Sequence, residues 1–292
     1  MKEFKGLMTP IITPFNNNDE ISEQMLRDHI NYLIENGVDM IFPCGSTGEF
    51  AKLSNEERKF VIKIVVDEVN NRVPVFAGTA ADSTRDTVMY SKYAEDIGAD
   101  GVVIVPSYYS KITEEGVYEH FKAVYEKINI PIMLYNNPAR SMIDVQPELI
   151  AKLGEEGYIS YVKESSGDIR RCMKIIKLTD KVKVFVGIDT IALPALLMGA
   201  EGWVCSSSNV IPRECADIYD ATIVSNESKA KELFYKLYPF FEFIESGLLI
   251  GVCKAGLKLK GRDVGIPRKP ILPLNDKQLH SLKSIMQNLG LI

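Results

Sequence analysis

The chain has 292 residues, of which 46% are hydrophobic and 25% charged, and its formal net charge is −5 at pH 7. A chain of this length can bury one large core, and its negative charge gives no basic field of the kind that nucleic acid or an anionic membrane attracts. No apolar segment approaches the roughly 18 residues that a membrane span requires. We therefore expect a protein that binds neither nucleic acid nor membrane.

The cysteines are five in number and form no C-x-x-C pair, which argues against both a disulfide framework and a zinc ribbon. The N-terminus is charged, and the short apolar stretch after it is broken by Pro10 and Pro14, which is not the pattern of a signal peptide. A reducing, cytoplasmic setting is the expectation.

Short apolar segments of β type alternate with longer amphipathic segments from the start of the chain. The predicted strands are 6–13, 39–43, 73–78, 101–105, 130–135, 158–163, 182–187 and 202–206. Helical patterns lie near 22–36, 54–69, 84–97, 114–128, 146–153, 168–178, 189–198 and 212–222. Three further helices are expected in residues 224–292.

Residues that start and end helices support these boundaries. Ser54 followed by Glu57 predicts a capping box, and Thr113 and Asp168 are plausible N-caps. Glycine precedes several of the following strands, as at Gly37, Gly98 and Gly199.

Eight strand-then-helix units in strict alternation, with nearly all-apolar strands, predict an α/β protein of the (β/α)8 type, a TIM barrel. We expect residues 1–223 to form the barrel and residues 224–292 to form a C-terminal helical extension of the same structural unit. An open, doubly wound sheet is the alternative. For dinucleotide binding it would need a G-x-G-x-x-G after its first strand, but that strand ends in Thr13-Pro14-Phe15.

In such a barrel the active site lies at the C-terminal ends of the strands. Hydroxyl groups, tyrosines and one lysine predominate at these positions, and the three histidines all fall in predicted helices instead. No H-E-x-x-H or similar ligand cluster is present. We expect no metal and no cofactor.

Lys163 ends a predicted strand, so its side chain should point inward near the barrel mouth. A lysine buried there loses hydration, which lowers its pKa and supplies the neutral amine that attacks a carbonyl. The alternative is a structural ion pair with Glu164 or Asp189. Tyr135, at the end of the preceding strand, can carry protons for imine formation, or it is a core tyrosine. The polar residues around the lysine favour the chemical interpretation.

The segment 45–49, Gly-Ser-Thr-Gly-Glu, is a strand-to-loop turn rich in backbone N–H groups. Its two hydroxyl side chains stand between two glycines, which suits a small carboxylate. A simple turn with no ligand is the other interpretation of this segment, and the pentapeptide alone does not decide between them.

Further motifs follow the turn in order: Tyr-Tyr at 108–109, Tyr-Asn-Asn-Pro-Ala-Arg at 135–140, Val-Lys-Glu-Ser-Ser-Gly-Asp at 162–168 and Gly-Ile-Asp at 187–189. Together they resemble, over essentially the whole chain, the family of dihydrodipicolinate synthases and N-acetylneuraminate lyases. The resemblance implies a lyase that binds pyruvate, or a related 2-oxo acid, as a Schiff base on Lys163.

By the same resemblance, Tyr135 transfers protons, Ser46 and Thr47 hold the pyruvate carboxylate and join the proton relay, and Tyr109 completes that relay, in some members across a subunit boundary. Further substrate contacts are expected at Gly48, Arg140, Gly187, Asp189, Val204 and Ser206. The family resemblance also implies a homotetramer built as a dimer of dimers.

The second substrate is left open by the sequence. Arg140 matches the arginine with which the synthases hold the carboxylate of aspartate semialdehyde, as they do in lysine biosynthesis. Ser46 and Phe50 instead match members that act on sugar acids or hydroxy-oxoglutarate. An aldolase, dehydratase or deaminase of another 2-oxo acid, including N-acetylneuraminate and hydroxyproline-derived acids, is thus an alternative. A non-catalytic pyruvate sensor is another, although pyruvate binding alone needs neither Lys163 nor Tyr135.

Overall fold

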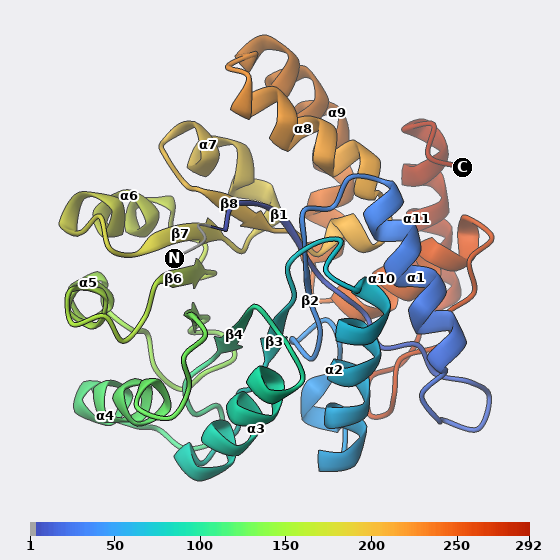
Figure 1. Ribbon diagram of the computed structural model, residues 1–292. Coiled ribbons are helices and arrows are strands. Elements are labelled where there is room, and N and C mark those ends of the chain that lie inside the picture. Colours follow the sequence, from blue (N-terminus) through green and yellow to red (C-terminus); the bar gives the residue numbers. More distant parts are fainter. Residues whose placement is uncertain (1–3) are drawn as a thin grey trace. The chain divides into compact units, whose positions relative to one another are not determined.

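The computed structural model describes residues 4–292, and its strands alternate with helices along this part of the chain (Figure 1). They form an eight-stranded sheet in the order β2-β1-β8-β7-β6-β5-β4-β3. The strands are β1 (Gly6–Pro10), β2 (Met40–Phe42), β3 (Phe76–Gly78), β4 (Gly101–Ile104), β5 (Ile132–Asn136), β6 (Tyr161–Glu164), β7 (Lys183–Val186) and β8 (Gly202–Val204).

Each strand is followed by a helix, and three more helices end the chain. The helices are α1 (Glu23–Glu35), α2 (Asn55–Val69), α3 (Thr84–Asp96), α4 (Glu114–Tyr125), α5 (Pro147–Glu155), α6 (Ile169–Leu178), α7 (Ala192–Leu197), α8 (Pro212–Ile223), α9 (Glu227–Glu245), α10 (Leu249–Leu259) and α11 (Asp276–Asn288). This order of parallel strands and helices is that of a TIM barrel with C-terminal helices, as predicted.

The chain divides into two compact units. The first unit comprises Met1–Gly6 and Pro74–Val204, and the second comprises Leu7–Val73 and Cys205–Ile292. The first unit therefore holds β3 to β8, and the second holds β1, β2 and the helices from α8 onward. The predicted division into a barrel of residues 1–223 and an extension of residues 224–292 stays a prediction.

Local sequence signals fix most of the boundaries. The capping box of Ser54 and Glu57 forms at the start of α2, and Thr113 and Asp168 cap α4 and α6 through their side chains. β3 and β5 start later than predicted, after Pro74 and Pro131, because proline has no N–H to give to the ladder. β6 also starts later than predicted, at Tyr161 and not at residue 158.

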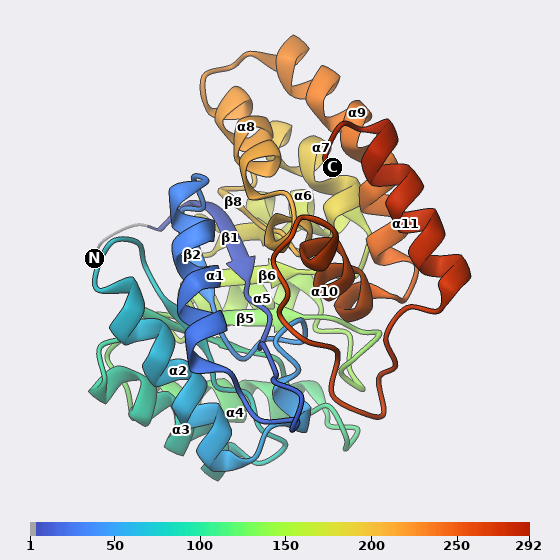
Figure 2. The ribbon, with the colours of Figure 1, turned by 90° about the vertical axis from the view of Figure 1, so that its right-hand side faces the viewer.

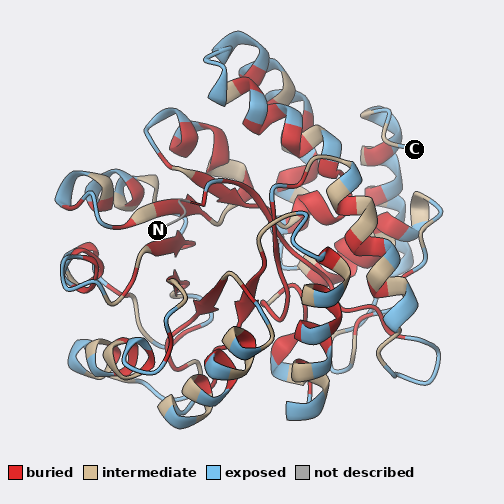
Figure 3. Cartoon of the chain, in the orientation of Figure 1, coloured by how far each residue is buried: buried red, intermediate tan, exposed pale blue. Residues whose placement is uncertain are grey.

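The strands of the first unit are buried along their length, whereas its helices are buried on one side only (Figure 3). Aromatic rings from three of these strands pack against one another. The ring centroids of Phe76 and Tyr161 lie 5.7 Å apart, and those of Tyr161 and Phe185 lie 5.9 Å apart. The Tyr161 hydroxyl also accepts a hydrogen bond from the backbone N–H of Phe4. These contacts join β3, β6 and β7 within the first unit.

In the second unit, α9 contacts α8, α10 and α11 (Figure 2). Asn209 links the end of β1 to the segment before α8: its side chain accepts from the N–H of Ile12 and donates to the carbonyl of Pro10. Its oxygen also lies 3.2 Å from Nε2 of the buried His29, and burial lowers the pKa of that histidine to about 4. Among residues 4–292, no helix is both long and apolar enough to cross a membrane.

Candidate active site

Lys163 and Tyr135 are neighbours in the first unit. They are register partners on β6 and β5, and both side chains are buried, with 5% exposure each. The Lys163 Nζ lies 4.0 Å from the centroid of the Tyr135 ring. The structure thus brings together the amine and the phenol that the sequence singled out, at the C-terminal ends of two adjacent strands.

Gly187, just after β7, makes room for the lysine. A Cβ atom at this position would lie 2.7 Å from Cε and 2.9 Å from Cγ of Lys163, closer than side chains tolerate, and it would also strike the Ser165 hydroxyl. The absence of a side chain at Gly187 therefore shapes the space that the lysine stem occupies.

The two carboxylates that the sequence offered as ion-pair partners of Lys163 are engaged by other donors. Glu164 accepts from the Asn136 amide at 3.0 Å and from the backbone N–H of Ser166 at 2.8 Å, and Arg171 lies 3.5 Å away. Asp189 accepts from the Trp203 indole at 2.9 Å. These contacts fix the ends of β5, β6 and β8 beside the lysine.

Arg140 lies in the loop that follows β5, and its side chain is exposed. The Asn137 carbonyl anchors this loop, since it accepts from the N–H groups of Arg140 and Ser141 and from the Ser141 hydroxyl. At the far end of the loop, Asp144 pairs with Arg171 of α6 at 3.0 Å. The loop that carries the Arg140 guanidinium is thus held by hydrogen bonds near its start and by an ion pair near its end.

Tyr109 differs from the buried pair, because 84% of its side chain is exposed. Its loop is held by Asp82, which accepts from the Ser107 hydroxyl at 2.5 Å and from the N–H of Tyr109 at 3.1 Å. These hydrogen bonds, that of Ser107 above all, lower the pKa of Asp82. Within one chain, the structure orders the backbone at Tyr109 but leaves its ring in solvent.

The predicted carboxylate-binding turn lies in the second unit. Thr47 is buried, and its hydroxyl stands 3.4 Å from that of Ser206, while Ser46 is half-buried. The Gly48 carbonyl accepts from the Thr13 hydroxyl at 2.7 Å, and a Cβ on Gly48 would lie 2.8 Å from the carbonyl oxygen of Ile11. The turn is therefore packed tightly against the end of β1.

A buried ion pair supports the same turn. Glu49 has φ of 59°, and its side chain lies 2.9 Å from the Lys254 ammonium of α10. Its other oxygen accepts from the N–H of Arg268 at 2.9 Å. The Lys254 Nζ also donates to the Ile266 carbonyl and lies 4.2 Å from the centroid of the Phe15 ring. Burial lowers the pKa of Lys254, and Glu49 opposes that shift.

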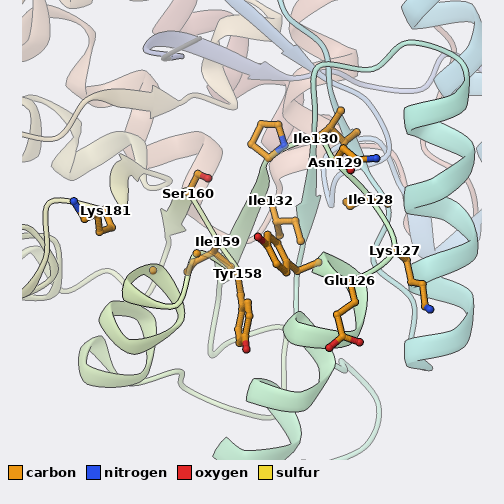
Figure 4. Close-up of a pocket in the computed structure, with 14 residues that line it drawn as sticks. Glu126, Lys127, Ile128, Asn129, Ile130, Ile132, Tyr158, Ile159, Ser160 and Lys181 are labelled. Carbon is orange, nitrogen blue, oxygen red and sulfur yellow. The ribbon is translucent and has the colours of Figure 1, made fainter. Parts of the chain in front are cut away.

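A cavity of about 700 Å³ in the first unit is formed by the segments 125–132 and 154–160 together with Lys181 (Figure 4). It lies at the starts of β5 and β6, whereas Tyr135 and Lys163 stand near their ends. This cavity is thus not the site of the lysine. No group of three or more His, Cys, Asp or Glu residues within 4–292 is arranged to hold a metal ion.

The comparisons with known proteins agree with this geometry. Residues 3–289 match the model of the dihydrodipicolinate synthetase family. The chain belongs to this family. The 4-hydroxy-tetrahydrodipicolinate synthase of Syntrophus aciditrophicus is 41% identical over 292 residues, which covers 99% of each chain.

Two solved dihydrodipicolinate synthases extend the comparison. The chloride-inhibited enzyme of Acinetobacter baumannii complexed with pyruvate has a TM-score of 0.94 and 32% identity, and the match covers 99% of each chain. A monomeric dihydrodipicolinate synthase variant has a TM-score of 0.94 and 29% identity, over 99% of this chain and 98% of that one. The predicted family and the TIM-barrel fold are confirmed, and the chain is an enzyme of the dihydrodipicolinate synthetase family.

The structure groups the predicted site residues within their own units. Lys163, Tyr135, Gly187 and Asp189 lie at the ends of β5 to β7, and Val204 is buried at the end of β8. Thr47, Gly48 and Ser206 come together in the second unit. Sequence analysis missed Asn137, whose side chain contacts Tyr135. The Asn-Asn doublet after the tyrosine was visible, but nothing in it assigns one amide to the phenol.

Proposed function

We propose that this protein is a 4-hydroxy-tetrahydrodipicolinate synthase, which condenses pyruvate with aspartate semialdehyde in lysine biosynthesis. The observation that carries the proposal is the buried pair of Lys163 and Tyr135 at the ends of β6 and β5. The choice of reaction is supported by relatives of that name that match over the full length of the chain.

In the proposed reaction, the deprotonated amine of Lys163 attacks the carbonyl carbon of pyruvate. The two protons of the amine pass to the carbonyl oxygen, which leaves as water, so that a C=N bond replaces the C=O bond. A group beside the amine must move these protons, and the Tyr135 phenol is the neighbour that can do so. The related synthase solved with pyruvate supports this first substrate.

We assign the pyruvate carboxylate to the turn of Ser46 and Thr47, with Gly48 and Ser206 beside it, on the basis of the family resemblance. The buried Thr47 hydroxyl and the tight packing of the turn in its own unit support a preorganised carboxylate site. Tyr109 is assigned to the proton relay by the same resemblance, and its exposed ring suits a role completed by another subunit. A homotetramer is the proposed assembly.

Arg140 is the residue that favours the synthase over the sugar-acid enzymes. Its side chain is exposed at the loop after β5, and no hydrogen bond or ion pair engages its guanidinium among the described residues. It is therefore available for the carboxylate of a second substrate, in the bidentate contact that arginine makes well. We place the enzyme in the cytoplasm, since its five cysteines are all buried and form no disulfide with one another.

Covalent trapping with turnover tests the proposal. Incubation of the protein with pyruvate and borohydride is expected to reduce an imine and add mass to the peptide that contains Lys163. Turnover is then measured with aspartate semialdehyde and with sugar aldehydes. An adduct on another lysine, or on none, would contradict the Schiff base. An adduct on Lys163 combined with a preference for an uncharged sugar aldehyde would move the protein to the sugar-acid enzymes.

Arg140→Ala tests the second substrate separately. We expect the KM for aspartate semialdehyde to rise. If the ion pair is desolvated, the binding free energy of this substrate should weaken by on the order of 2–5 kcal/mol. Trapping of pyruvate is expected to persist. Arg140→Lys should restore little, because an ammonium cannot make the two-pronged contact. Arg170→Ala is the matched control, since that arginine is 86% exposed and pairs only with Asp168 among the described residues.

A further inference from the structure

Asn137 makes one side-chain hydrogen bond that the reaction can use. Its amide nitrogen donates to the Tyr135 phenol oxygen over 2.8 Å, and the two side chains are only 8% and 5% exposed. Water therefore competes little for this contact, and in such surroundings a hydrogen bond is stronger than in solvent.

The Asn137 side chain contacts the Tyr135 phenol, whereas the Asn137 backbone contacts the loop. It is the carbonyl of Asn137 that binds Arg140 and Ser141, through the backbone. The amide oxygen is buried and has no hydrogen-bond partner among residues 4–292, so the contact with Tyr135 is the one that the side chain makes there. A residue kept merely to cap the loop would be expected to place its amide on loop atoms.

We propose that Asn137 is a positioning residue for Tyr135 in the imine-forming step, an inference that rests on the proposed function. Because the phenol oxygen accepts the amide N–H, the phenol's own proton points away from Asn137. When the proton has left, the same N–H donates to a phenolate, and a hydrogen bond to a charged oxygen is stronger than one to a neutral oxygen. Asn137 therefore favours the proton-transferred state over the ground state.

Two substitutions of similar size to asparagine test the role. Asn137→Leu removes the donor, and we expect kcat to fall about 10- to 100-fold, the range for a hydrogen bond to a charged group, with the KM for pyruvate nearly unchanged. The limb of the pH profile that depends on Tyr135 should move to higher pH. Asn137→Asp keeps the shape but offers no donor as a carboxylate, so it should lose at least as much.

Ser141→Ala is the matched control. It removes the hydroxyl that donates to the Asn137 and Ile143 carbonyls but leaves the amide on the phenol. We expect it to change the KM for the second substrate and to leave the pH profile in place. Circular dichroism checks that each variant is folded. If Asn137→Leu does not fold, Asn137→Asp provides the measurement.

The decisive experiment repeats Asn137→Leu in the Tyr135→Phe background. If the amide acts through the phenol, the substitution should cause no further loss of kcat there, because coupled residues are not additive. An equal loss in both backgrounds, or parental kcat in Asn137→Leu and Asn137→Asp, would overturn the inference. Wild-type turnover in Tyr135→Phe alone would contradict the proton-transfer role of Tyr135, and the inference with it, while the synthase reaction would stand; loss of the Lys163 adduct would instead contradict the proposed function.

Discussion

Two lysines are buried to a similar extent in this chain, and their neighbours differ. Lys163 is 5% exposed and has the Tyr135 ring 4.0 Å from its Nζ, with Gly187 against its stem. Lys254 is 1% exposed and has the Glu49 carboxylate and the Ile266 carbonyl each at 2.9 Å. Burial alone therefore does not decide which of the two lysines is the proposed nucleophile.

The difference lies in what the neighbours do to a proton. A carboxylate at 2.9 Å favours the ammonium form of Lys254 and so opposes nucleophilic attack by that amine. A phenol beside Lys163 can exchange protons with a substrate, and a glycine leaves space for the lysine stem. The comparison predicts one reactive amine and one supporting amine, and each of the following changes tests it.

The largest effect is expected from Lys163→Ala. Trapping of pyruvate by borohydride and turnover should both be abolished, because no second amine is prepared for attack. Lys254→Met should still trap pyruvate on Lys163 under conditions where it is folded. Mass spectrometry of the digested protein is the measurement. Labelling of Lys254 in the parent enzyme would contradict the supporting role given to that lysine.

The second largest effect is expected from Tyr135→Phe. We expect kcat to fall by roughly 10²–10⁴-fold with little change in KM, the usual range for a general acid–base group. Steady-state kinetics with both substrates checks this, and the unfolding midpoint controls for packing. Parental turnover would return Tyr135 to a purely structural role.

Lys254→Met is expected to act on stability. It leaves the Glu49 carboxylate buried without its ammonium, which costs about 3–5 kcal/mol in the free energy of unfolding. Urea unfolding measures the loss. Lys258→Met on the same helix is the control, since that lysine is 68% exposed, and it should cost no more than about 1 kcal/mol. Equal losses in the two variants would remove the structural role given to Lys254.

The smallest effect is expected from Glu57→Gln. Glu57 pairs with Arg268 at 2.8 Å, and this hydrogen bond is the main cause of its lowered pKa. A carboxylate with a lowered pKa stabilises the fold above its ordinary value near 4.3, and the contribution is lost as the pH falls through the lowered value. The variant should cost about 0.5–1 kcal/mol at pH 7 and nothing in strong acid. A loss that is the same at both pH values would contradict this assignment.

Much of the surroundings of Lys163 could be predicted from the sequence. Alternation of apolar segments gave β5 and β6, and the end of each strand placed Tyr135 and Lys163 at the same level. The contact of Gly187 with the lysine stem could not be predicted, because it depends on side-chain volumes between neighbouring strands. The hydrogen bond from the Asn137 amide to the Tyr135 phenol could not be predicted either, since either asparagine of the doublet can turn toward the tyrosine.

The surroundings of the second lysine could not be predicted. Lys254 lies in an apolar helix that gives no sign of a partner, and Glu49 was noticed only as the end of a turn. Their pairing depends on tertiary packing between distant segments, for which neither periodicity nor local spacing carries a signal. Buried charge pairs of this kind have to be found in the structure.

The wide separation of the residues that support the Gly45–Glu49 turn has a consequence for the newly made chain. The Glu49 carboxylate accepts a hydrogen bond from the N–H of Arg268, which lies 219 residues later in the chain. At about 5–20 residues per second, a ribosome needs on the order of 10–40 s to deliver that partner. The second unit, Leu7–Val73 with Cys205–Ile292, therefore cannot form until its second segment is made, by which time Pro74–Val204 is already complete. Nascent chains are expected to bury β6, which carries Lys163, before the Gly45–Glu49 turn is secured.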